Sequence, residues 1–75
     1  MAIIETRMEI WCGKDSYGEE KAKAIAIVAG TLNMIPIHCV HLDYDHKKTH
    51  HIQVYANPIK IALFRQALKN ARIDF

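Results

Sequence analysis

The fold is decided by one stretch, IHCVHLDYDHKKTHHIQVYA at residues 37–56, in which two alternating runs flank a polar segment. The alternation predicts a strand over residues 37–44, a loop at residues 45–49 and a further strand after it. An antiparallel register with this loop keeps apolar side chains together on one face and polar ones on the other. The predicted apolar pairs are Leu42–Ile52 and Val40–Val54, and the predicted polar-face pairs are Asp43–His51, His41–Gln53 and Cys39–Tyr55.

A strand and a helix precede this hairpin. Residues 4–12 alternate, which predicts a half-buried first strand. Ser16 followed by Glu19 fits a capping box, so a helix is expected to begin near Tyr17 and to end at Asn33. Apolar residues at helical spacing predict the buried stripe of this helix, which consists of Ala22, Ile25, Ala26, Ala29 and Leu32.

A second helix follows the hairpin. Asn57 is the expected N-cap and Pro58 the first helical residue, because proline lacks the amide that a helix start leaves unpaired. The tail at residues 73–75 alternates and predicts a short last strand. The expected buried stripe of the second helix is Ile61, Phe64, Leu68 and Ala71.

The order strand, helix, strand, strand, helix and short last strand resembles the ferredoxin-like α/β plait over essentially the whole chain, on topology alone. The resemblance implies an α+β fold, βαββα with a short last strand, in which the third strand lies between the first two. Both helices then cover one face of an antiparallel sheet. Because this fold hosts many unrelated activities, function has to be argued from sites.

Length and composition predict one domain at residues 1–75. The chain has 51% apolar residues and a formal charge of +2, a globular balance that does not indicate nucleic acid as a partner. No stretch reaches the roughly 20 apolar residues of a membrane span, so we expect no membrane partner and a cytoplasmic location. Cys12 and Cys39 are far apart in sequence and are expected to be free thiols.

All five histidines fall between His38 and His51, beside two aspartates. In the expected register His41, Asp43 and His51 share the polar face, where imidazoles and a carboxylate can hold a divalent metal such as zinc. Such a protein would be a metal sensor or a hydrolase with a metal-activated water. The competing interpretation is a solvated polar hairpin, because the spacing matches no known zinc motif. No catalytic residue is otherwise indicated, and an enzyme is the less favoured class.

The polar face of the sheet also carries two aromatic residues, Trp11 and Tyr55, among Arg7, Glu9 and Gln53. Aromatic anchors within a polar rim are typical of protein-contact surfaces. The sequence therefore predicts a small regulatory or protein–protein interaction module that binds a larger protein partner through this face. Stacking of single-stranded RNA on the same aromatics is a further alternative, which the acidic side chains oppose.

Self-association is also expected, because so short a chain buries only a thin core. Pro36 removes an edge donor at the start of the second strand, whereas Ile3 and Ile4 leave the edge of the first strand unguarded. A homodimer is therefore predicted through the first strand or through the open sheet face.

Overall fold

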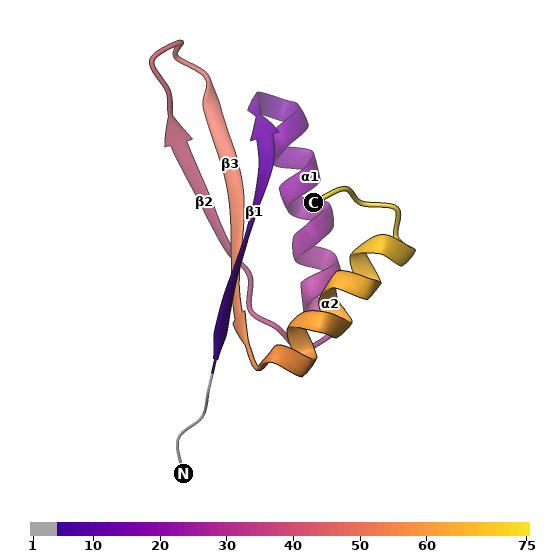
Figure 1. Cartoon of the computed structure of the whole chain (residues 1–75). Helices are drawn as coiled ribbons and strands as arrows, with labels where there is room; N and C mark the ends of the chain where they lie inside the picture. The colour runs from indigo at the N-terminus through magenta and orange to yellow at the C-terminus, as the bar shows by residue number, and fades with distance from the viewer. Residues whose placement is uncertain (1–4) are drawn as a thin grey trace.

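A computed structural model describes residues 5–75 of the chain. Its elements, in order, are β1 (Thr6–Lys14), α1 (Asp15–Thr31), β2 (Ile37–Leu42), β3 (Lys48–Ala56) and α2 (Pro58–Asn70). The strands form one antiparallel sheet in the order β1-β3-β2, and both helices lie on one side of it (Figure 1). The prediction of a small α+β protein, with β3 central and both helices on one face, is confirmed. The expected edge at Ile3 and Ile4 lies outside the described residues.

The predicted short last strand is wrong, since residues 73–75 form no strand. Helix α2 ends in a left-handed residue, Arg72 with φ 59°, and the Ile73 amide donates to the Leu68 carbonyl at 2.9 Å. This ending turns the tail back over the helices, where Ile73 packs against the core. The sheet of the described residues therefore has three strands, and the fourth strand of a complete plait is absent from this part of the chain.

The hairpin loop lies two residues earlier than predicted, at residues 43–47. The Asp43 amide donates to the Lys47 carbonyl at 2.9 Å, Asp45 accepts from the Lys47 amide at 3.1 Å, and His46 takes a left-handed φ of 62°. Turn chemistry at these aspartates therefore sets the register, against the better apolar match of the predicted one. The observed register differs from the predicted one by an even number of residues, so every side chain of the hairpin keeps its predicted face. The observed pairs include Val40–His50, Cys39–His51 and His41–Thr49.

The start of α1 also differs from the prediction. The helix begins at Asp15, its N-cap is Lys14, and no side chain caps it. The predicted capping box of Ser16 and Glu19 does not form, because Ser16 already lies inside the helix; the Glu19 carboxylate lies 3.2 Å from Lys23 Nζ, one turn later.

The predicted end of α1 and start of α2 are confirmed. Asn33 takes a left-handed φ of 57° after α1, and the Met34 amide donates to the Ala29 carbonyl at 3.0 Å, as in a Schellman ending. Asn57 accepts from the Lys60 amide at 2.8 Å and Pro58 opens α2.

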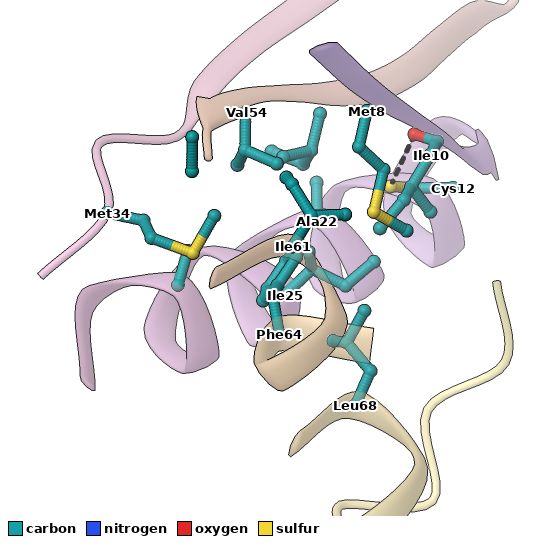
Figure 2. Packing of buried hydrophobic residues seen from close by; sticks show 13 residues of the cluster. Met8, Ile10, Cys12, Ala22, Ile25, Met34, Val54, Ile61, Phe64 and Leu68 are labelled. Carbon is teal, nitrogen blue, oxygen red and sulfur yellow. Dashed lines mark hydrogen bonds between the residues drawn. The ribbon is translucent and has the colours of Figure 1, made fainter. Parts of the chain in front are cut away.

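The core lies between the helices and the covered faces of β1 and β3, where the apolar side chains interdigitate (Figure 2). Of the predicted stripes, Ala26 and Leu32 are only half-buried and Ala71 is exposed, since it lies beyond α2. Strand β2 contributes no residue to the core of the described chain. The core consists of Met8, Ile10, Cys12, Ala22, Ile25, Ala29, Met34, Ile52, Val54, Ala56, Ile61, Phe64 and Leu68.

Two glycines of the same helix give a matched test of this packing. A methyl group at Gly18 would collide with the backbone of Gly13, where β1 meets α1, whereas one at Gly30 would meet nothing within 4 Å. Alanine is preferred over glycine in a helix by roughly 0.5–1 kcal/mol. We therefore expect Gly30→Ala to raise the free energy of unfolding by up to about 1 kcal/mol and Gly18→Ala to lower it. Denaturant titration of both variants measures this, and a stabilising Gly18→Ala would contradict the packing.

Candidate functional site

The open face is the side of the sheet that the helices leave uncovered. Three cross-strand pairs of β1 and β3 lie on it, Arg7–Tyr55, Glu9–Gln53 and Trp11–His51. The five residues predicted to bind a partner therefore do lie together. Trp11 is 58% exposed and Tyr55 is 45% exposed, and the register separates them by four residues, about 13 Å along the strands.

A continuous chain of polar contacts runs across the open face. Arg7 Nη1 lies 3.6 Å from Glu9 Oε1, and the same oxygen accepts from Gln53 Nε2 at 2.9 Å. Gln53 Nε2 also lies 3.2 Å from His51 Nε2. His51 Nδ1 in turn lies 3.0 Å from Nε2 of His41 on β2. These five side chains link all three strands on one surface.

The chain of contacts fixes the proton on each imidazole. The Glu9 carboxylate only accepts, so the Gln53 amide must turn its NH₂ group toward it, and the second hydrogen of that group points at His51 Nε2. His51 Nε2 is therefore an acceptor, and the proton of the neutral ring sits on Nδ1. That proton is donated to His41 Nε2. A neutral His51 is thus the state that satisfies every contact in the chain.

The aromatic ring of Trp11 covers His51. Their ring centroids are 4.4 Å apart, and the His41 ring stacks on His51 at 4.8 Å with an interplanar angle of 10°. His51 is consequently only 4% exposed, although it lies on the uncovered face. Burial lowers the pKa of His51 below its ordinary value, the neighbouring His41 lowers it further, and Glu9 opposes both effects.

The predicted metal ligands are only partly brought together. His41 and His51 are neighbours, but Asp43 is not opposite His51, because the register places it in the hairpin loop. There its carboxylate accepts from the Thr49 hydroxyl and lies 3.6 Å from Lys14 Nζ. Within residues 5–75, no three His, Cys, Asp or Glu side chains are arranged to hold one metal ion.

A second histidine pair on the helix-covered side escaped the sequence reasoning. His38 Nε2 lies 2.8 Å from Nδ1 of His50, which is 5% exposed. The Lys23 ammonium does most to hold the pKa of the Glu19 carboxyl on α1 below its ordinary value, and the two rings lower it a little further. The sequence pattern could have shown this pair, because His38 alternates with Val40 and His50 alternates with Ile52, which places both histidines on the helix-covered face. Each face of the hairpin therefore carries one hydrogen-bonded imidazole pair.

Both cysteines are free, as predicted. β3 separates their strands, so they cannot pair. The Cys12 thiol donates weakly to the Ile10 carbonyl at 3.6 Å (Figure 2), and burial raises its pKa, so it stays protonated at neutral pH. Cys39 lies opposite His51, on the open face.

Comparisons of this chain with family models, with curated proteins and with solved structures find no match.

The stability of the protein should fall in mild acid because of His51. Its pKa is lowered in the folded state, so the unfolded chain binds the proton more readily once the pH drops below the ordinary value of 6.5. The stabilisation is complete above that pH and is lost as the pH falls toward the folded-state pKa. Denaturant titrations at pH 7.5 and pH 5 should show this loss, and His51→Gln should reduce it.

The matched control is His46, an exposed loop histidine whose left-handed backbone also suits asparagine. We expect His46→Asn to leave the acid loss unchanged. An equal loss in wild-type protein and His51→Gln would contradict the assignment.

Proposed function

We propose that this protein is a small interaction module that self-associates and receives a larger protein partner on its open face. The observation that carries this proposal is the exposed pair of aromatic anchors, Trp11 and Tyr55, at the two ends of an ordered polar row. Tryptophan, tyrosine and arginine are the side chains that most often dominate the energy of protein interfaces. Arg7 lies directly opposite Tyr55 and completes this set.

The order of the open face supports binding by a preformed surface. Trp11 is held against His51, and the polar side chains between the anchors are hydrogen-bonded to one another. Side chains that are already fixed lose less conformational entropy when a partner arrives. The charges of Arg7 and Glu9 offset each other, which favours a protein partner over the phosphate backbone of a nucleic acid.

Two finer assignments belong to this proposal. The order β1-β3-β2 with both helices on one face fits three strands of the ferredoxin-like plait, and we assign the chain to that fold class. The two free cysteines fit a reducing compartment, which supports a cytoplasmic location.

Substitution of either anchor should abolish partner capture without unfolding the protein. Loss of a central aromatic anchor costs about 2 kcal/mol or more, roughly thirtyfold in Kd. We therefore expect Trp11→Ala and Tyr55→Ala to lose a partner that the wild-type protein retains from cell extract, with unchanged circular dichroism. Ile27→Ala is the matched control, since Ile27 is 70% exposed on α1, away from the open face. The proposal would be refuted if both anchor variants retained the partner as well as Ile27→Ala does.

A divalent-metal site is the second candidate, favoured by one observation. His41 Nε2 and His51 Nδ1 are 3.0 Å apart, close to the separation of two nitrogens bound to one zinc ion. Metal binding would, however, move the His51 proton from Nδ1 to Nε2, where the Gln53 NH₂ group now points. The hydrogen-bond chain from Glu9 therefore works against this candidate.

The metal candidate has a sharp test in the group behind His51. Replacing Gln53 by glutamate supplies a carboxylate that can accept the His51 Nε2 proton, as carboxylates commonly do for zinc-bound histidines. Gln53→Glu should therefore tighten Zn²⁺ binding by about tenfold or more, and His51→Ala should abolish it, both measured by calorimetry. Zn²⁺ binding that survives His51→Ala but is lost in His46→Asn would assign the ion to the hairpin loop instead.

A further inference from the structure

The two edges of the sheet differ in their protection. The β1 edge carries the charged residues Arg7, Glu9 and Lys14, and its pairing is irregular between Trp11 and Gly13. Charges and bulges are devices that keep edge strands from pairing with other chains. Strand β2, which reads IHCVHL, contains no charged side chain. The unprotected edge of the described sheet is therefore β2, although the sequence pointed to the first strand.

Strand β2 also leaves apolar surface uncovered. The helices pack chiefly on β1 and β3, and Figure 1 shows β2 at the edge of the sheet that lies farther from both helices. Val40 is 49% exposed and Leu42 is 70% exposed, although both project toward the helix side of the sheet. A strand that adds to this edge would cover them and would pair the free backbone groups at the same time.

The hairpin register identifies the free backbone groups. Because the Asp43 amide bonds to the Lys47 carbonyl, the odd-numbered residues of β2 direct their amides and carbonyls toward β3. His38, Val40 and Leu42 therefore direct theirs outward. The next even position is Pro36, which has no amide hydrogen to offer. The outer edge of β2 thus presents the free amides and carbonyls of three alternate residues.

We infer that a second copy of this chain pairs with β2 in antiparallel fashion about a two-fold axis through Val40, forming a continuous six-stranded sheet. In this register Val40 faces Val40 of the second copy, and His38 faces Leu42 in both directions. All outward groups of the three residues are paired. Sliding by one pair would set Pro36 against Leu42 or bring Tyr44, outside β2, against His38. Pro36 therefore disfavours one of these slips and the end of β2 at Leu42 disfavours the other, whereas the sequence interpretation had Pro36 discourage pairing at this edge.

A second copy fits this edge better than an unrelated strand for two reasons. An isologous interface must be self-complementary, and β2 places Val40 on the axis with apolar Leu42 beside it. Because β2 is uncharged when its histidines are neutral, no like charges meet across the axis. The axis stands perpendicular to the sheet, so the two open faces lie side by side on one surface. The inference thus specifies the self-association within the proposed function and does not depend on partner capture.

The first test is the mass of the protein in solution. Sedimentation equilibrium at neutral pH should give twice the chain mass of 8.6 kDa. Val40→Lys sets two ammonium groups against each other across the axis and should raise the dimer Kd by at least about tenfold. Ile27→Lys is the matched control, which adds the same charge at an exposed α1 residue and should leave the dimer intact. A wild-type protein that is monomeric at 100 µM overturns the inference.

The second test fixes the register by disulfide formation, in a background where Cys39 is replaced by serine. Val40→Cys sets two thiols directly opposite each other, at a Cα separation of about 5.5 Å, which a disulfide spans. Leu42→Cys should not cross-link, because the two copies of residue 42 are about 13 Å apart in this register. Equally rapid cross-linking of both variants would exclude the Val40-centred register.

Failure of this inference can be told from failure of the proposed function. If the dimer pairs through β2, Trp11→Ala and Tyr55→Ala keep the dimer mass even where they lose the partner. If those variants become monomeric while Val40→Lys stays dimeric, the copies meet through the open face, and the β2 interface is wrong.

Discussion

The structure depends on one constraint, which is that two helices can cover only two of the three strands. Alternate residues of β1 and β3 pack under α1 and α2, and the buried core of the described chain comes from these elements and Met34. Strand β2 is held mainly by its hydrogen bonds to β3 and by the loop that joins them. Its two faces and its outer edge are therefore left for other contacts.

On the open face, Glu9 fixes the orientation of the neighbouring polar side chains. A carboxylate accepts hydrogen bonds and cannot donate, so it orients the Gln53 amide, which in turn sets the proton of His51 and its bond to His41. Trp11 completes the arrangement by covering His51. The exposed aromatic ring is thus supported from below by side chains of β2 and β3, which gives a surface residue the fixed position usually found in a core.

Sequence reasoning recovered the features that local chemistry or burial controls. The Asn57 cap, the Asn33 helix ending and the buried alternation of β1 are each set by a few neighbouring residues. The hairpin register was missed because it was matched on apolar pairs, and the β2 partners of those pairs are not buried. Where burial does not reward a register, the turn decides it, and Asp43 and Asp45 form that turn earlier in the chain. The displaced register separated Asp43 from His51, whereas His41 stays diagonal to His51 on the open face, as the sequence had predicted.

The chemistry of the reactive side chains also favours an interface over a reaction. His51 uses both ring nitrogens within the protein, Asp43 is occupied by Thr49 and Lys14, and the Cys12 thiol is buried and protonated at neutral pH. A general base or nucleophile needs a free lone pair directed at substrate, and these three groups do not offer one. What the open face and the β2 edge do offer is half-exposed apolar area, oriented aromatic rings and unpaired backbone groups. Those are the elements from which protein interfaces are built, and they lie on the part of the sheet that the helices leave uncovered.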